Sequence, residues 1–282
     1  MTEHTRQDTV NRLHPAPHEQ VQLEGLYLDH RLHRRGQGGL PCVYSNFITS
    51  LDGRIAVGES GHTTHTVPAA ITNPRDWRLY QELAGQADIL ITSGRFYRQS
   101  SIGEAQDILP VGNQPAFADI RRWRIEQGLQ AQPDIAIMSG SLDIPLDALQ
   151  PYRDRRLIVV TGAGASGNRI QTLQNHGIEI IRAGAGRRVD GRLMVEHLAA
   201  SGYRSLYAIA GPAVFGTLLQ ARVVDRLYLT LACTLLGGYV FDTLTRAEPL
   251  VPPQGMRLGS LYHDPLAPAG AGQLFAMFES GR

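Results

Sequence analysis

Short apolar runs alternate along this chain with segments in which apolar residues recur every three or four positions. The runs at 42–49, 87–93 and 156–162 are rich in β-branched, aliphatic and aromatic residues and predict buried strands. The periodic segment 72–86, TNPRDWRLYQELAGQ, has a cap residue and an early proline and predicts a helix. Strands separated by helices favour a three-layer α/β fold, in which a mostly parallel sheet has helices on both faces.

The same pattern continues towards the C-terminus. Further strands are predicted at 134–139, 178–184, 204–211, 223–238 and 272–280, and further helices at 115–129, 165–177, 191–202 and 212–221. The last two strands follow each other without a helix, which predicts an antiparallel edge and therefore a mixed sheet. The Gly/Pro-rich segment 249–272 between them is predicted to be a loop.

The N-terminal part of the chain has a different character. Residues 1–39 are polar and rich in His, Arg and Gln, and we interpret them as an extension that precedes a single domain over 40–282. Within the extension, 20–32 predicts a short helix with Leu23 and Tyr27 on one side. We expect this segment to pack on the domain or on a second subunit.

Composition narrows the classes of function. The 282 residues are 43% hydrophobic and 19% charged, with a net charge of +1, so neither nucleic acid nor a membrane surface is the expected partner. The N-terminus lacks the apolar core of a signal peptide, which predicts a cytoplasmic protein. All 27 basic residues are arginine, and the absence of lysine excludes Schiff-base chemistry and a P-loop. No metal site is predicted.

Small or polar residues follow several of the predicted strands. They include Ser139-Gly140-Ser141, the TGAGASG turn at 161–167, and Ala210-Gly211-Pro212 at the start of a helix. Because ligands of open parallel sheets bind at the carboxyl ends of the strands, these turns could hold an anion with two phosphate groups, such as a dinucleotide. The alternative is that the glycines only permit tight turns.

The stretch TSLDGRIA at 49–56 follows a predicted strand and contains a hydroxyl group, a carboxylate and a guanidinium group within five residues. Asn46 and Ser50 share one face of the strand, because alternate residues do, and are expected to face the substrate. Asp52 begins an Asp-Gly turn and is a catalytic candidate together with Ser50. Arg54 is expected either to hold a substrate phosphate or to form an ion pair.

Three segments in order resemble one enzyme family. TSLDGRIA resembles the S-L-D-G-[KR]-x-A segment of the reductase domain of riboflavin-biosynthesis deaminase-reductases, which belong to the dihydrofolate reductase-like superfamily. Residues 71–94 resemble the helix and strand that follow it, and 206–238 resemble the family's ending, so the likeness spans roughly 41–278. It implies a homodimeric reductase that passes hydride from NADPH to a ribose-bearing aminopyrimidine. The preference for NADPH over NADH is left open.

The resemblance also assigns residues to the cofactor and the substrate. The implied cofactor contacts are Ala56, Gly94, Ser139, Thr161, Gly162, Gly211, Pro212, Ala213, Val214 and Phe215. The expected substrate contacts are Asn46, Ser50, Arg54 and Ser60. The proton that accompanies hydride transfer has no obvious donor, and the candidates are Asp52, His62, His65, Tyr97 and bound water.

Several positions depart from the family pattern on the substrate side. Ala210 stands where the family has glutamate, and Pro212 replaces the second glycine of a pair. The family's D-D-P run is absent from GRFYRQSS at 94–101, Ala84 replaces an arginine, and GHTTHTVPAA at 61–70 is an insertion. Two alternatives to a pyrimidine or pterin reductase therefore stay open. They are a non-catalytic nucleotide-binding relative and a reductase of an unrelated carbonyl or nitro compound.

Overall fold

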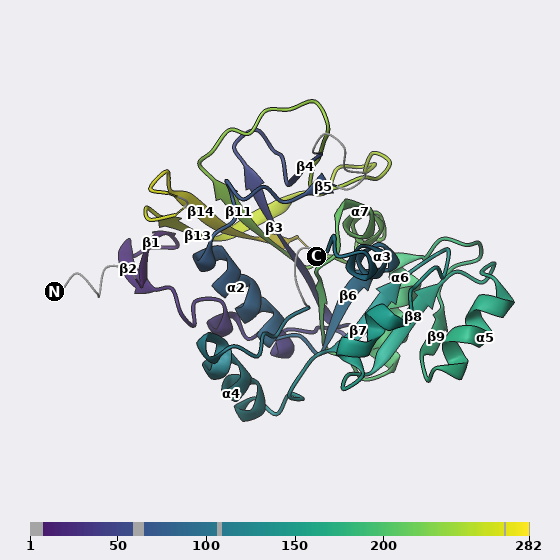
Figure 1. Ribbon diagram of the computed structural model, residues 1–282. Helices are drawn as coiled ribbons and strands as arrows, with labels where there is room; N and C mark the ends of the chain where they lie inside the picture. Colours follow the sequence, from purple (N-terminus) through teal and green to yellow (C-terminus); the bar gives the residue numbers. More distant parts are fainter. Residues whose placement is uncertain (1–7, 59–64, 106–108, 268, 282) are drawn as a thin grey trace.

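The computed structural model describes residues 8–58, 65–105, 109–267 and 269–281. Its main feature is an 11-stranded sheet in the order β2-β1-β13-β14-β11-β3-β10-β6-β7-β8-β9 (Figure 1). The parallel strands are β3 (Cys42–Ser50), β6 (Ile89–Ser93), β7 (Asp134–Met138), β8 (Leu157–Thr161), β9 (Glu179–Arg182), β10 (Ser205–Ala208) and β11 (Arg226–Ala232). The antiparallel strands are β14 (Gln273–Ser280), β13 (Met256–Asp264), β1 (Thr9–His14) and β2 (Glu19–Gln22). The predicted mixed sheet with an antiparallel edge is therefore confirmed.

Helices cover both faces of the sheet, as predicted. The helices are α2 (Pro74–Gly85), α3 (Gly94–Ser101), α4 (Ala118–Glu126), α5 (Gly167–Asn175), α6 (Gly191–Ala200) and α7 (Pro212–Gln220). Buried side chains of α2, α3, α4 and α5 join one hydrophobic core, and those of α6 and α7 join a second core on the opposite face. Shorter 3-10 turns lie at Leu28–His30, Leu32–Arg34, Pro115–Phe117 and Asp147–Tyr152.

The start of α2 illustrates how local sequence sets an element that matters for the site. The Asn73 side chain accepts hydrogen bonds from the backbone amides of Arg75 and Asp76 at 3.1 and 3.0 Å. Pro74 occupies the first helical position, where its missing N–H costs nothing. The helix therefore begins at Pro74 and places Asp76 in its first turn, beside the carboxyl ends of the central strands.

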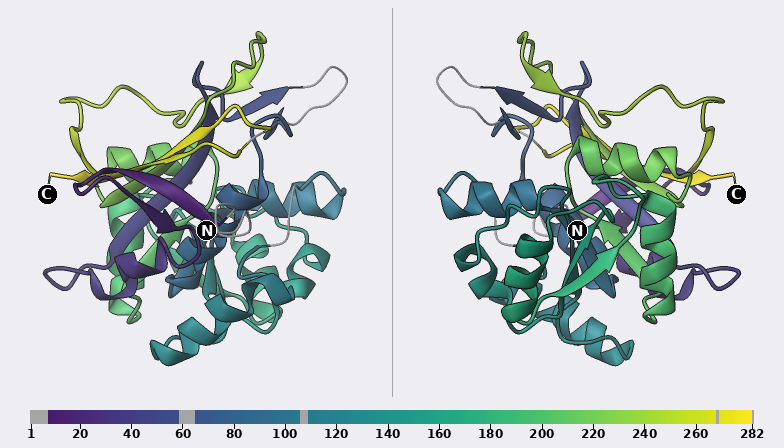
Figure 2. Two further views of the ribbon diagram at one scale, coloured as in Figure 1. Left: turned by 90° about the vertical axis from the view of Figure 1, so that its left-hand side faces the viewer. Right: turned by 90° about the vertical axis from the view of Figure 1, so that its right-hand side faces the viewer.

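A second, three-stranded sheet lies beyond the carboxyl end of β3. It consists of β12 (Phe241–Asp242), β4 (Ala56–Gly58) and β5 (His65–Thr66), all antiparallel (Figure 1). The sequence pattern did not predict it, because two of its strands are only two residues long. In the two side views of Figure 2 it rises above the main sheet, next to the C-terminal strands.

The predicted helix at 20–32 is wrong. Its first residues form β2, which pairs with β1, and Leu28–His30 form a 3-10 turn. Gly25 takes a positive φ of 85°, which ends the regular pattern. The carboxylate of Glu82 on α2 accepts hydrogen bonds from the amides of Gly25 and Tyr27, at 2.6 and 2.9 Å. The N-terminal segment is thereby fastened to α2, and its hairpin extends the main sheet (Figure 2).

The predicted loop at 249–272 is also wrong in its centre, because Met256–Asp264 form β13. The register of β13 against β14 shifts between Leu258 and Ser260, so Gly259 occupies an irregularity of the strand. The apolar run at 223–238 contributes β11, which pairs with β3 on one side and β14 on the other. An interior strand explains its apolar character without a second subunit.

Candidate active site

Four of the turns singled out in the sequence lie along one edge of the sheet. The strands β10, β6, β7 and β8 are consecutive neighbours and all parallel, so their carboxyl ends meet the same edge. This edge carries Gly211, Gly94, Ser139 and Thr161 in that order. Gly211 and Thr161 share the edge but are separated by β6 and β7. The arrangement is that of a ligand site at strand ends.

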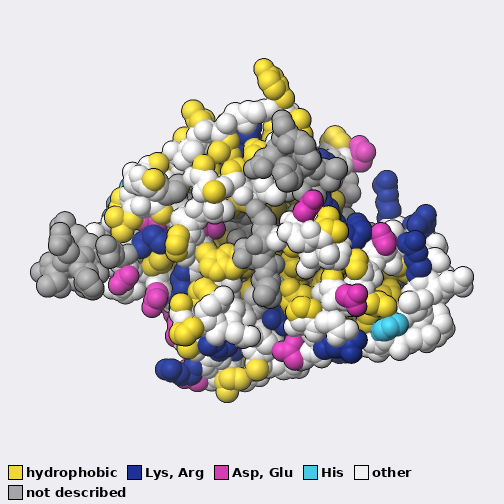
Figure 3. All heavy atoms as spheres, in the orientation of Figure 1, with side chains coloured by type: hydrophobic (Ala, Val, Ile, Leu, Met, Phe, Trp, Pro, Cys, Tyr) yellow, Lys and Arg dark blue, Asp and Glu magenta, His cyan; other side chains and the backbone are white. Residues whose placement is uncertain are grey.

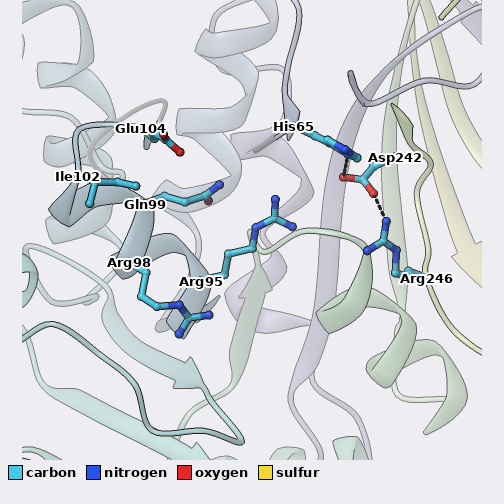
Figure 4. A pocket seen from close by; sticks show the side chains of 8 residues that line it. All are labelled: His65, Arg95, Arg98, Gln99, Ile102, Glu104, Asp242 and Arg246. Carbon is cyan, nitrogen blue, oxygen red and sulfur yellow. Dashed lines mark hydrogen bonds and ion pairs between the residues drawn. The ribbon is translucent and has the colours of Figure 1, made fainter. Parts of the chain in front are cut away.

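A cavity of about 450 Å³ lies beside this edge, between α3 and the three-stranded sheet (Figure 4). Its lining residues are His65, Arg95, Arg98, Gln99, Ile102, Glu104, Asp242 and Arg246. The amide of Arg246 donates to the carbonyl oxygen of Pro212 at 3.1 Å. That bond joins the cavity wall to the start of α7, which follows Gly211 at one end of the row of turns.

One wall of the cavity holds a histidine oriented by a carboxylate. His65 Nδ1 lies 2.8 Å from Asp242 Oδ2, and Asp242 Oδ1 accepts from the Arg246 guanidinium at 2.8 Å (Figure 4). Gly58 on the middle strand makes this pairing possible. A Cβ at that position would lie 3.2 Å from His65 Cδ2, so a side chain there would press on the imidazole.

The opposite wall is formed by α3. Figure 4 shows the Arg95 and Gln99 side chains pointing towards the His65 side of the cavity, whereas Arg98 points away. The Arg98 guanidinium donates to the carbonyl oxygen of Asp143 at 2.7 Å. Within the described ranges Arg95 has no hydrogen-bond or ion-pair partner. The cavity therefore offers an uncommitted guanidinium to an anionic ligand.

Asp52 is held in a dense set of contacts at the turn after β3. Its carboxylate accepts hydrogen bonds from the Ser50 hydroxyl and from the amide of Gly237 at 2.8 Å, and it pairs with Arg54. The guanidinium of Arg54 also lies 4.4 Å from the ring centroid of Phe241. The Ser50 hydrogen bond, followed by the Gly237 amide, lowers the pKa of Asp52 to about 2. A carboxyl group with that pKa is ionised at neutral pH and is unsuited to donate a proton.

Asn46 and Ser50 face the α2 side of the sheet, as the alternation of the strand predicts. The Tyr207 hydroxyl donates to Asn46 Oδ1, and Thr230 stands between Asn46 and Ser50 on the neighbouring strand β11. The Thr230 hydroxyl donates to Asp76 Oδ1 on α2 at 2.6 Å. Sequence reasoning missed Asp76, because a carboxylate in the first turn of a helix is already explained by the helix dipole.

The residues assigned to the cofactor by resemblance fall into two groups. Gly211 and Ala213 are exposed at the start of α7, and a Cβ at Gly211 would meet no atom within 4 Å. Val214 and Phe215 instead point into the core, where Phe215 packs on Phe47 with ring centroids 5.0 Å apart. Only the backbone of these two residues is available to a ligand.

The turn after β8 is covered by a neighbouring loop. A Cβ at Gly162 would lie 1.9 Å from the carbonyl oxygen of Gly186, so the 184–188 loop packs directly on this turn. Thr161 is fully buried, and its hydroxyl has no partner among the described residues. At the turn after β7, Ser139 approaches Gly94 so closely that a Cβ on the glycine would lie 2.9 Å from Ser139 Oγ.

The remaining sequence candidates are placed as follows. Tyr97 is fully buried in the core under α3, and burial raises the pKa of its hydroxyl, so it is unsuited to exchange protons with a ligand. Ala56 begins β4, beside Asp242 on β12. Ser60 and His62 lie outside the described residues. Of the three proton-donor candidates that the structure describes, Asp52, His65 and Tyr97, only His65 lines the cavity.

A mixed α/β sheet with glycine turns and an arginine-lined cavity at its carboxyl edge is the arrangement typical of proteins that bind small anionic ligands at strand ends. A comparison of the sequence with models of protein families identifies the family of this chain. The chain belongs to the RibD C-terminal domain family, whose model matches residues 41–261. This is the reductase-domain family of riboflavin biosynthesis that the motifs indicate, so the resemblance is confirmed.

Solved structures share the fold at low sequence identity. A pyrimidine reductase-like protein from Corynebacterium diphtheriae is 20% identical, with a TM-score of 0.64 over 86% of this chain and 92% of that one. The riboflavin biosynthesis reductase Rib7 of Saccharomyces cerevisiae is 16% identical, with a TM-score of 0.58 over 91% and 99%. RibD of Acinetobacter baumannii is 16% identical, with a TM-score of 0.59, and this chain covers 59% of it. A comparison with curated proteins finds no match.

Proposed function

We propose that this chain is an NADPH-dependent reductase of a pyrimidine- or pterin-type compound that carries an anionic group. The observation that carries the proposal is the single row of strand-end turns beside an arginine-lined cavity. Membership of the reductase-domain family supports the same reaction class. When bound, NADPH supplies the hydride, and the protein supplies binding and orientation.

The residues present fit such a cofactor. The exposed backbone at Gly211 opens α7, and the empty space beside it would let a pyrophosphate approach the helix N-terminus. The buried, unpartnered hydroxyl of Thr161 is an unsatisfied polar group at the same edge. We therefore assign Gly211 to Ala213, with Gly94, Ser139 and Thr161, to the cofactor side.

The substrate side is assigned to the α2 face of β3 and to the cavity. Asn46 and Ser50 are the proposed contacts to the ring compound, and Arg95 is the proposed contact to its anionic group. The ion pair of Arg54 with Asp52 supports a structural role for that arginine, which holds the turn that leads into β4. Ser60 stays a sequence-based candidate.

A binding experiment with matched glycine variants tests the cofactor assignment. NADPH fluorescence titrated with the wild type should report micromolar binding. Gly211→Val should weaken binding at least tenfold, because the new side chain fills the space that the phosphates would use. Gly255→Val is the control, since Gly255 is also exposed and a Cβ there would meet no atom within 4 Å, but it precedes β13 at the other side of the sheet. Equal affinity of all three proteins would refute the assignment.

Turnover distinguishes the candidate functions. Oxidation of NADPH with 5-amino-6-(5-phosphoribosylamino)uracil, the substrate named for a Thermotoga maritima structural relative, supports the pyrimidine reductase. Oxidation only with other carbonyl or nitro compounds supports the divergent reductase, which the alanine at position 210 favours. Binding without oxidation of NADPH by any member of such a panel supports the non-catalytic relative.

The organisation of the protein is proposed from its sequence pattern. We retain residues 1–39 as an extension and 40–282 as the reductase domain, and the family match begins at residue 41.

A homodimer is proposed, and light scattering should give twice the chain mass. Exposed hydrophobic side chains gather at the top of the molecule in Figure 3, and the loop before β12 includes the exposed Leu235, Tyr239 and Val240. None of the helices in the described part of the chain has the length and apolar character to span a bilayer.

A further inference from the structure

A second cavity, of about 390 Å³, lies at the opposite edge of the sheet from the candidate active site. It is formed where β8 and β9 begin, between the end of α5 and the 3-10 turn Asp147–Tyr152. The strand β8 runs from this cavity at Leu157 to the carboxyl edge at Thr161, a span of about 13 Å at roughly 3.3 Å per residue. A ligand in this cavity would therefore not overlap one bound at the carboxyl edge.

Part of the lining of this second cavity is apolar. Leu149 and Ile178 are buried members of the hydrophobic core on this face of the sheet. Leu146 and Leu157 are half-buried and pack against that core. Because removing apolar surface from water is favourable, these side chains can bind the apolar part of a ligand.

The charged part of the lining is mainly cationic. Arg153, Arg155 and Arg156 bring three guanidinium groups, against the single carboxylate of Glu179. Two of these arginines are already engaged. Arg155 donates to the carbonyl oxygen of Pro110 at 2.6 Å, and Arg156 pairs with Glu179 at 2.6 Å. The cavity therefore keeps a net positive charge beside its apolar side chains.

Arg153 is the uncommitted cation of this cavity. Its side chain is exposed and, among the residues that the structure describes, has no hydrogen-bond or ion-pair partner. Its backbone amide donates to the carbonyl oxygen of Gln150 at 3.4 Å, which holds the residue at the end of the 3-10 turn. A guanidinium group binds a carboxylate, sulfonate or phosphate through paired hydrogen bonds. Arg153 can therefore receive the anionic group of a ligand.

His176 adds a hydrogen-bonding group at the end of α5. Its Nδ1 lies 2.8 Å from the carbonyl oxygen of Thr172. A carbonyl oxygen only accepts, so Nδ1 carries a proton, and in the neutral imidazole Nε2 is left as an acceptor. The exposed ring can therefore accept an N–H or O–H group of a ligand that lines up with it in the cavity.

We propose that this cavity is a second binding site, which takes a small monoanion with an aromatic or aliphatic body. The body lies against the leucine and isoleucine side chains, and the anionic group pairs with Arg153. The ligand carries one anionic group because one guanidinium of the cavity is uncommitted. The volume of the cavity falls in the range of small-molecule pockets, about 300–1,000 Å³. This site does not depend on the proposed function.

Two fluorescent probes of the same shape test the proposal. 8-Anilinonaphthalene-1-sulfonate joins an aromatic body to one sulfonate, and N-phenyl-1-naphthylamine is the same body without the charge. The wild type should bind the sulfonate with a micromolar Kd. Arg153→Ala should weaken that binding about tenfold, the usual effect of losing a hydrogen bond to a charged group, and should change binding of the uncharged amine less than about twofold.

Matched variants control for the apolar wall and for arginine loss in general. Leu146→Asn should weaken binding of both probes, because it removes apolar surface from the cavity. Arg122→Ala should bind both probes as the wild type does. Arg122 is also an exposed arginine without a partner in the described part of the chain, but it lies on α4, outside the cavity. Circular dichroism should show that every variant is folded.

The cavity at the carboxyl edge is the competing location for the sulfonate, because Arg95 is uncommitted there. Arg95→Ala should leave one equivalent of sulfonate bound, and Arg153→Ala should lose that equivalent. Equal sulfonate affinity in Arg153→Ala and the wild type would overturn the proposal. So would sulfonate binding that only Arg95→Ala removes, or an equal loss of both probes in Arg153→Ala, since the arginine would then not act through its charge. None of these results depends on NADPH.

Discussion

Replacing Asp76 by asparagine should stabilise the protein at alkaline pH. In the folded protein the pKa of this carboxyl is raised from 3.8 to about 6, because burial disfavours the ionised form. Above pH 6 the folded state therefore carries a charge that the unfolded chain solvates better. Asparagine removes that charge and can still accept the hydrogen bond of Thr230.

The magnitude follows from the pKa difference. A difference of about two units corresponds to roughly 3 kcal/mol, at 1.36 kcal/mol for each unit. Because the side chain is only half-buried, solvent screens part of this cost, and we expect about 1–2 kcal/mol at pH 8. Between pH 6 and 4 the folded protein binds the proton more tightly than the unfolded chain does, so the wild type gains stability as the pH falls. The advantage of the variant should therefore vanish near pH 4.

Urea unfolding of the wild type and of Asp76→Asn at pH 8, 6 and 4.5 measures this difference. Asp147→Asn provides the matched removal of a carboxylate from an exposed position and should show little pH-dependent change. A variant that is less stable than the wild type at pH 8 would mean that the ionised carboxylate supports the fold. A stability difference independent of pH would show that Asp76 does not titrate between the two states. Either result would refute the reasoning.

Three further predictions test neighbouring contacts. Thr230→Val removes the hydroxyl that favours the ionised carboxylate, so the titration midpoint of Asp76, followed by the carboxyl ¹³C resonances of the free protein, should rise; an unchanged midpoint would contradict the contact. Arg95→Ala should raise KM for a phosphorylated substrate about tenfold with little effect on kcat, and equal KM values would exclude Arg95 as the anion contact. Gly162→Ala should destabilise the protein by about 1–3 kcal/mol in urea unfolding, because the added methyl group meets the Gly186 carbonyl oxygen; wild-type stability would show that the covering loop is free to move.

The main sheet could be predicted because its strands are marked by strong local signals. Runs such as Ile89–Ser93 are apolar on both faces, and the helices between them carry caps and regular spacing. Local sequence signals gave the wrong prediction for β13, where the glycine and proline residues around Met256–Asp264 suggested a loop. That strand is stabilised by pairing with β14 over its whole length, a tertiary effect that composition does not reveal.

The candidate site was predictable only in part, for a similar reason. Strand ends such as Thr161 and Gly211 follow from the element pattern and from the rule that parallel strands end at one edge. The pairing of His65 with Asp242 joins residues 177 positions apart on two-residue strands, so no local pattern marks it. The contact of Asp76 with Thr230 likewise exists only because α2 packs across the carboxyl end of β11.

Four of the eight residues that line the cavity at the carboxyl edge come from segments that depart from the family. His65 belongs to the insertion at 61–70, and Arg95 belongs to the 94–101 segment, which lacks the family's D-D-P run. Gly211, by contrast, keeps the first glycine of the family's pair and has open space beside it, and the proposed function assigns it to the cofactor. If the proposed cofactor edge is retained and the facing walls differ from the family, we infer that the substrate has changed and that the class of reaction has not. On this argument 5-amino-6-(5-phosphoribosylamino)uracil should be a poorer substrate than another anionic ring compound, and a panel in which it gives the highest kcat/KM would contradict the change.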